Sequence, residues 1–410
     1  MTRYALATAV FAAFASTSNA QTQQVKPPVA VYWMSIETHA GMGMSMPVGL
    51  GGFLPQGAQG AQSGKRMKLD LGSAQNASGT PRANHAIPAG LSMGQSLPLV
   101  TPEGQRAAPR GETDEQPFER SKGRILVFWG CGETIRAGQP VIVDFAKMGS
   151  ADAKAFRSRN ISRPAGPAPG RNRTYGDWPN RESSTGVPQQ ASLVGEHTVA
   201  GNYSPDIQFT VGDRHDFMAP VAFDPVRKTS AGAFQVKWQG ISTAIGYFAT
   251  ASAPGESQND FVMWSSSDVQ EMGHALMDHL PPSEVQRLLK ERIVLSPQTT
   301  ECTVPAGIFK GEGAMLNFIA YGDELNFVHP PRPKDPRQVW EQQYAVKVRL
   351  KSTGMTMLAE GDMGGRARGR GDTSTQQADE RTVPQQPARA PTAADAVQEG
   401  VNMLRGLFGR

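Results

Sequence analysis

The chain has 410 residues, of which 41 are Lys or Arg and 37 are Asp or Glu, so its formal net charge is only +4. This mild charge does not favour a nucleic-acid partner, and 44 Gly, 31 Pro and 39% hydrophobic residues indicate a large share of loop. Beyond the first 20 residues, no stretch approaches the roughly 20 apolar residues of a membrane-spanning helix, so no transmembrane segment is expected.

Residues 1–20 have the three-part pattern of a cleavable secretory signal peptide. A short basic start precedes an uncharged apolar run at residues 5–15, and small residues at 18 and 20 occupy the positions that a signal peptidase reads. We therefore expect cleavage between Ala20 and Gln21 and a periplasmic or secreted mature protein. A buried helix start or a membrane anchor is the alternative.

The N-terminal region, residues 21–150, is expected to be rich in β-structure. Runs of β-branched, aromatic and alternating residues predict four strands, at 29–36, 66–71, 124–129 and 141–145. The last two are joined by a glycine-rich loop, which favours an antiparallel pair.

Residues 151–191 are rich in Arg, Pro, Gly, Ser and Asn, a composition typical of a disordered basic linker. Short strands separated by turn residues then predict a region like a β-sandwich at 192–352. Two helices are expected within 267–293, because Ser267 with Gln270 and Ser283 with Gln286 have the spacing of capping boxes. A second disordered linker is expected at 353–391.

The C-terminal segment, residues 392–410, is predicted to form an amphipathic helix. Its apolar residues share one helical face at positions i, i+4, i+7 and i+11, namely Val397, Val401, Leu404 and Phe408. This face could dock on the chain's own core, on a partner or a second copy, or on a membrane surface.

Two cysteines, Cys131 and Cys302, are the whole cysteine content. In an oxidising compartment they are expected to form a disulfide, with two unpaired thiols as the alternative. A nucleophilic role for Cys131 is disfavoured, since no histidine lies near it in sequence.

A candidate soft-metal segment comprises His39, Met42, Met44 and Met46. Imidazole and thioether ligands suit Cu(I), and alternate spacing places the three sulfurs on one side of an extended chain. The competing interpretation is a loop whose methionines fill gaps against the core. Copper is therefore an alternative, and no cofactor is the primary expectation.

The predicted helix after Ser267 would carry Glu271, His274 and Asp278 on one face, beside His279. Three such groups could hold a divalent ion, but a solvated helix face with local ion pairs is favoured. We predict no catalytic residues.

Some segments resemble those of known proteins. Phe234 to Trp238 followed by Tyr247 to Ala249 resembles part of the fibronectin type III strand pattern, over about 207–265. The pieces WGCGE (129–133), GNYSPDIQFTVG (201–212) and TECTVPAGIF (300–309), with the Leu-Phe-Gly near the end, resemble exported proteobacterial proteins without an assigned function. These resemblances imply a fold and a location but no chemistry.

The sequence thus predicts a mainly β protein, with an antiparallel sandwich-like core, two short helices, disordered linkers and a terminal amphipathic helix. The expected function is a non-enzymatic binding or structural component of the bacterial cell envelope, with an envelope protein or polymer as partner. A periplasmic copper-binding protein and a hydrolase without a recognisable motif are the alternatives.

Overall fold

The computed structural model describes residues 23–41, 63–103, 123–144, 161–257, 259–310 and 313–359. The predicted signal peptide, the methionines at 42, 44 and 46, and the predicted helix at 392–410 lie outside these ranges. Within them the protein is mainly β with a sandwich-like core, as the sequence predicts. No helix in the described ranges is long and apolar enough to cross a membrane.

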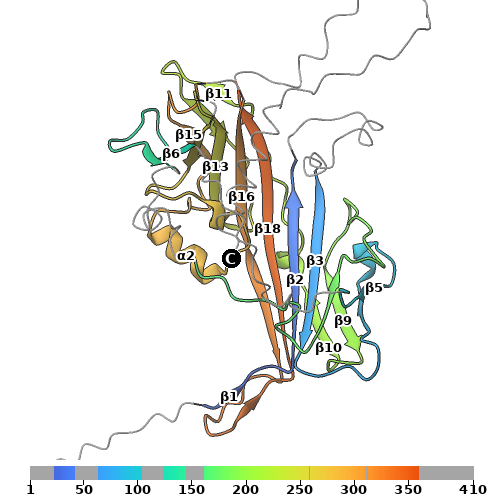
Figure 1. Ribbon diagram of the computed structural model, residues 1–410. Coiled ribbons are helices and arrows are strands. Elements are labelled where there is room, and N and C mark those ends of the chain that lie inside the picture. Colours follow the sequence, from blue (N-terminus) through green and yellow to red (C-terminus); the bar gives the residue numbers. More distant parts are fainter. Residues whose placement is uncertain are drawn as a thin grey trace, which may run out of the picture.

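A nine-stranded sheet is the centre of the molecule, and its long middle strands run almost the full length of the view in Figure 1. Most neighbours are antiparallel, but β6 pairs with β14 and β18 with β2 in parallel. Its strands in spatial order are β7 (Val141–Asp144), β6 (Arg124–Trp129), β14 (Asp260–Ser265), β13 (Ala244–Pro254), β16 (Ala314–His329), β18 (Tyr344–Leu358), β2 (Ala30–His39), β3 (Gly64–Ser73) and β8 (Thr174–Trp178).

Two smaller sheets cover one face of this central sheet, and a third short pair lies at its tip. The four-stranded sheet contains β10 (Ile207–Val211), β9 (Gly195–Gly201), β4 (Ala83–Ala86) and β5 (Ser96–Leu99). The three-stranded sheet contains β11 (Arg227–Lys228), β12 (Phe234–Lys237) and β15 (Glu301–Val304). The pair at the tip is β1 (Val25–Lys26) with β17 (Trp340–Glu341), and 3₁₀ turns occur at Ala89–Leu91, Asp213–His215 and His274–Leu276.

The main core lies between the central sheet and the two smaller sheets. Successive side chains of a strand point to opposite faces, so every second residue of the central strands enters this core. In β2 these residues are Tyr32, Met34 and Ile36, each at most 1% exposed. On the three-stranded side, the ring of Trp238 packs against Phe318 and Tyr247, with centroids 4.8 and 5.7 Å away.

The opposite face of the central sheet is covered in one half by the helix α2 (Pro282–Lys290). Val285 and Leu288 of α2 are fully buried against Phe248 of β13 and Ile319 of β16. This helix corresponds to the second one predicted, although it begins at a proline and its N-cap, Pro281, makes no side-chain hydrogen bond. The other half of this face is polar.

The first predicted helix, from Ser267 to about His279, is wrong. Ser266 extends the ladder of β14 by exchanging hydrogen bonds with the backbone of Ala249, and the Ser267 hydroxyl accepts from the amide of Val269 in a turn. Gly273 then adopts a φ of +78°, which an α-helix does not accommodate. Only the short turn at His274–Leu276 is helical in this stretch.

The two predicted linkers also need correction where they are described. Within 151–191, residues 174–178 form β8, because Tyr175 and Trp178 are only 5% and 2% exposed and anchor the edge of the central sheet. The composition of the whole segment predicts a linker because polar residues, Pro and Gly far outnumber these two aromatic residues. Strand β18 continues to Leu358, six residues into the second predicted linker, and residues 360–391 lie outside the described ranges.

A disulfide joins Cys131, which follows β6, to Cys302 of β15. It links the central sheet to the three-stranded sheet across a sequence separation of 171 residues. A cross-link over such a long loop restricts the unfolded chain strongly.

We expect the double variant Cys131→Ser/Cys302→Ser to have a free energy of unfolding lower by about 2–5 kcal/mol, because the unfolded chain regains the entropy of the open loop. Urea unfolding of the variant and of the wild type, with and without reductant, measures this difference. Equal unfolding midpoints and slopes for the wild type and the variant in the absence of reductant would contradict the expectation.

Candidate binding pocket on the polar face of the central sheet

The polar half of the central sheet carries charged side chains from adjacent strands in register. Arg349 of β18 lies opposite Ser35 of β2, which lies opposite Lys68 of β3. Two residues further along each strand, Lys347 lies opposite Trp33, and Trp33 lies opposite Asp70. All of these side chains alternate with residues of the main core, so they share the opposite face.

A β-bulge in β16 brings a carboxylate to this face. Tyr321 pairs with Lys351 and Glu324 pairs with Arg349, so β16 contains one residue more than β18 between these pairs. Before the bulge even-numbered residues enter the main core, whereas after it odd-numbered residues do. The extra residue therefore turns Glu324 towards the polar face.

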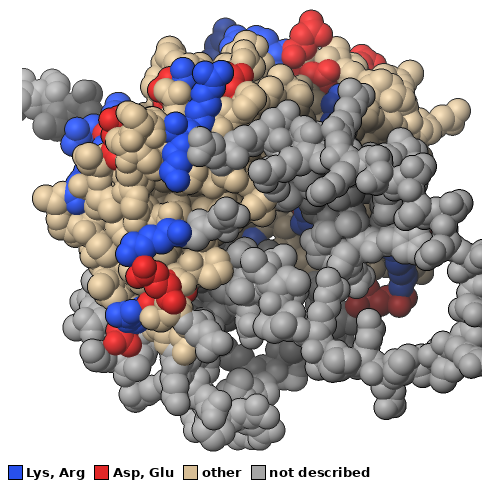
Figure 2. Space-filling view, turned by 90° about the horizontal axis from the view of Figure 1, so that it is seen from above, with Lys and Arg blue, Asp and Glu red and all other residues tan. Residues whose placement is uncertain are grey.

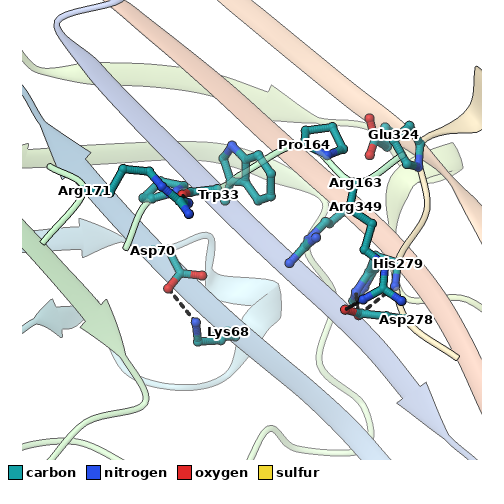
Figure 3. Close-up of a pocket in the computed structure, with 13 residues that line it drawn as sticks. Trp33, Lys68, Asp70, Arg163, Pro164, Arg171, Asp278, His279, Glu324 and Arg349 are labelled. Carbon is teal, nitrogen blue, oxygen red and sulfur yellow. Dashed lines mark hydrogen bonds and ion pairs between the residues drawn. The ribbon is translucent and has the colours of Figure 1, made fainter. Parts of the chain in front are cut away.

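A pocket of about 190 Å³ lies between this face and two covering segments, residues 163–171 and 278–281. Figure 3 shows side chains from β2, β3, β16 and β18 reaching it from the sheet and those of the covering segments from the other side. Its lining residues are Trp33, Lys68, Asp70, Arg163, Pro164, Gly166, Pro167, Arg171, Asp278, His279, Pro281, Glu324 and Arg349.

Gly166 allows the covering segment to lie flat on the indole ring of Trp33. A Cβ at this position would lie 2.7 Å from two carbons of that ring, which is too close for any side chain. The contact between Gly166 and Trp33 therefore sets the height of the pocket.

Each carboxylate that lines the pocket already has a cationic partner. Lys68 Nζ lies 2.6 Å from Asp70 Oδ1, and the Tyr175 hydroxyl donates to the same oxygen at 2.5 Å. Asp278 Oδ2 lies 3.6 Å from Arg163 Nη1, and Asp278 Oδ1 lies 3.8 Å from Lys351 Nζ.

Glu324, the third carboxylate of the lining, is bound by Lys347. The two residues come from neighbouring strands and both are mostly buried. Together these ion pairs leave no lining carboxylate without a cation.

Among the described residues, the guanidinium of Arg349 forms no ion pair, although the carboxylates of Asp278, Asp70 and Glu324 lie near enough to act on it electrostatically. It lies over the indole ring of Trp33, 4.7 Å from the centroid, and its Nε donates to Ser35 Oγ at 2.8 Å. In the described ranges, no hydrogen bond or ion pair engages its two terminal amino groups. Burial lowers the pKa of Arg349 from its usual value, although an arginine of this kind keeps its charge at neutral pH.

His279 and Asp278 lie at the opposite end of the pocket from Asp70 and Lys68 (Figure 3). The Nε2–H of His279 donates to the carbonyl of Ile36 at 3.0 Å. Burial lowers the pKa of His279, and the hydrogen bond from His279 together with nearby Lys351 lowers the pKa of Asp278. The Asp278 carboxylate is therefore ionised near pH 7.

The candidate site residues of the sequence analysis do not form one site among the described residues. His39 is buried at the end of β2 with its Nδ1 2.8 Å from Thr353 Oγ1, whereas its proposed partners Met42, Met44 and Met46 lie outside the described ranges. Asp278 and His279 enter the pocket, but Glu271 lies away from it, within a turn that closes on Ser265. Among the described residues, no group of three or more His, Cys, Asp or Glu side chains could hold a metal ion.

The main pocket residues, Trp33, Asp70 and Arg349, are not among those that the sequence patterns single out. Their one signal is the alternation of charged and apolar residues in 344–352, where Lys347, Arg349 and Lys351 occupy every second position. Such alternation ordinarily marks a solvated strand face, and the composition of residues 163–171 predicts a linker.

The described surface seen from above carries acidic and basic side chains interspersed with other residues (Figure 2). In this view neither charge forms a broad continuous surface.

A second polar cluster is buried between the central and four-stranded sheets. The Tyr32 hydroxyl donates to His85 Nδ1 at 2.9 Å, His85 Nε2–H donates to His197 Nδ1 at 2.9 Å, and His197 Nε2–H donates to the Leu193 carbonyl at 2.7 Å. This chain of donors satisfies both imidazoles only in their neutral forms. Burial lowers the pKa of both histidines, and the proximity of His197 lowers that of His85 further.

No protein-family model matches the chain, and a search of curated proteins finds no match.

We expect the histidine cluster to make the free energy of unfolding decrease as the pH falls below about 6.5. An unfolded histidine has a pKa of about 6.5, so below this pH the unfolded chain binds protons that folded His85 and His197 exclude. The contribution of these histidines to the free energy of unfolding is fully present above pH 6.5. Below that pH it decreases by at most about 1.4 kcal/mol per pH unit for each histidine.

Urea unfolding at pH 7.5, 6.5 and 5.5 measures this slope. The double variant His85→Phe/His197→Phe should show a shallower slope than the wild type. A wild-type free energy of unfolding that is equal at pH 5.5 and 7.5 would refute the assignment of these depressed pKa values.

Proposed function

We propose that this is an exported, non-enzymatic binding protein of the bacterial cell envelope that takes a small ligand into the pocket between the central sheet and residues 163–171. The observation that carries this proposal is the guanidinium of Arg349, which is partly buried and held in place but forms no ion pair in the described chain. The carboxylates of Asp278, Asp70 and Glu324 offset part of the cost of its burial from a distance, and a ligand anion in direct contact would offset more of that cost.

The proposed location rests on the signal-peptide pattern of residues 1–20 and cleavage after Ala20. The disulfide between Cys131 and Cys302 is compatible with it, since disulfides persist in oxidising compartments. An envelope protein or polymer that presents the ligand is the corresponding partner.

Binding is favoured over hydrolysis by the chemistry of the lining. Among the residues that the structure describes, the lining holds no Ser, Thr or Cys that could serve as a nucleophile. His279, the one imidazole there, uses Nε2 to bind the Ile36 carbonyl and lies with Nδ1 beside Asp278. The carboxylates of Asp70 and Asp278 are held by cations, an arrangement that suits fixed charges better than a general acid.

The variant Gly166→Ala tests whether ligands bind in this pocket. Its methyl group would meet the Trp33 ring, so the covering segment must shift and the pocket must change shape. Gly186→Ala is the matched control, because a Cβ at Gly186 meets nothing within 4 Å.

Propionate, glucose and putrescine serve as anionic, neutral and cationic probes in ligand-observed NMR titrations of the wild type and both variants. At least one probe should bind the wild type and Gly186→Ala equally, bind Gly166→Ala at least about fivefold more weakly, and be recovered unchanged. If no probe binds, or if all three proteins bind alike, the pocket is not the binding site.

A further inference from the structure

The charges of the pocket specify one class of ligand. The lining contains the cations Lys68, Arg163, Arg171 and Arg349 and the carboxylates of Asp70, Asp278 and Glu324, and Lys347 and Lys351 behind it pair with Glu324 and Asp278. The cations therefore outnumber the carboxylates, and each carboxylate is already paired. This balance favours an anionic ligand over a neutral or cationic one.

The free edge of Arg349 specifies the shape of the anionic group. A guanidinium offers N–H donors along two useful edges, and Ser35 takes the Nε donor of one of them. The remaining end, formed by Nη1 and Nη2, presents two parallel donors, which match the two oxygens of a planar carboxylate. Figure 3 shows the guanidinium extending from β18 into the space between Trp33, Asp70 and Lys68.

The guanidinium is already fixed in the orientation that such a pair requires. Its stacking on Trp33 and its hydrogen bond to Ser35 hold its plane, so a ligand need not restrain a mobile arginine side chain. Trp33 is itself held by Gly166 from the covering segment.

The volume and the walls describe the rest of the ligand. About 190 Å³ is room for about six waters of about 30 Å³ each, below the roughly 300–1,000 Å³ of pockets for drug-sized ligands. The rings of Trp33, Pro164 and Pro167 supply apolar contacts beside the charged groups. These dimensions suit a short acid or the end of a longer chain.

We propose that the pocket binds the carboxylate group of a small organic acid or of a peptide C-terminus end-on to Nη1 and Nη2 of Arg349, with a short apolar part beside Trp33. This inference rests on the proposed function, since it names the ligand class of the same site. The carboxylate would form the direct ion pair that Arg349 does not make with any described residue.

Pairs of acids and isosteric amides test the proposal on the wild-type protein without any change to the fold. Propionate and benzoate represent free acids, and acetyl-dialanine with a free carboxylate represents a peptide C-terminus. Each acid should bind at least tenfold more tightly than its amide, and inorganic phosphate should bind more weakly than the best acid. The tighter of the two acid types identifies the source of the carboxylate.

Variants of Arg349 test the geometry. Arg349→Gln should weaken binding of the best acid at least tenfold, and Arg349→Lys, which keeps the charge but lacks the two parallel donors, should weaken it at least about threefold. Arg337→Gln removes the same charge from an exposed side chain outside the pocket and should leave binding unchanged. Melting temperatures establish that each variant is folded.

The outcomes separate this inference from the proposed function. If amides bind as tightly as acids and Gly166→Ala still weakens both, the pocket binds ligands but the carboxylate assignment is wrong. Tighter binding of phosphate, or full affinity in folded Arg349→Gln, also overturns it. If no compound binds in a way that depends on Gly166, the proposed function itself fails.

Discussion

The alternation of side chains along β2, β3 and β18 is the constraint on which the rest of the structure depends. One set of residues, such as Tyr32 and Met34, forms the main core against the smaller sheets, while the other set is charged and faces residues 163–171. Because both faces of these middle strands are covered at least in part, the more buried charges of this set must find partners within the layer. Lys68 and Asp70 of β3 meet this requirement as an ion pair, as do Lys347 and Glu324 on adjacent strands, whereas Arg349 forms no ion pair in the described chain.

Much of the fold follows from patterns that a single sequence carries. The strands at 29–36, 66–71 and 124–129 alternate or are continuously apolar, and the structure contains strands at each of these places. Capping residues misled the prediction at Ser267, because a serine that caps a helix also serves a tight turn at the end of a strand, and only Gly273 marked the difference. The composition of residues 151–191 predicted a linker, but a strand forms there. The burial of Tyr175 and Trp178 at the edge of the central sheet stabilises this strand despite its many polar neighbours.

The pocket could not be predicted in the same way, because its parts are far apart in the chain. Trp33, Gly166 and Arg349 meet only through the parallel pairing of β2 with β18 and the path of the covering segment. The bulge that turns Glu324 into the pocket is a one-residue shift of register, which the sequence shows only as an interruption between two apparent strands. The resulting site binds by fixed charge and shape, and it is supported by rigid strands on one side.

The central claim is that the free edge of Arg349 is the anion-binding group of this pocket. NMR of the guanidinium nitrogens in arginine-labelled protein tests it most directly, with the Arg349 signals assigned by their loss in Arg349→Gln. On titration with the best-binding acid, the account predicts that the Nη resonances of Arg349 shift and that rotation about its Cζ–Nη bonds slows, whereas those of Arg337 stay unchanged. Saturating binding of the acid without any change in the Arg349 resonances would contradict the account.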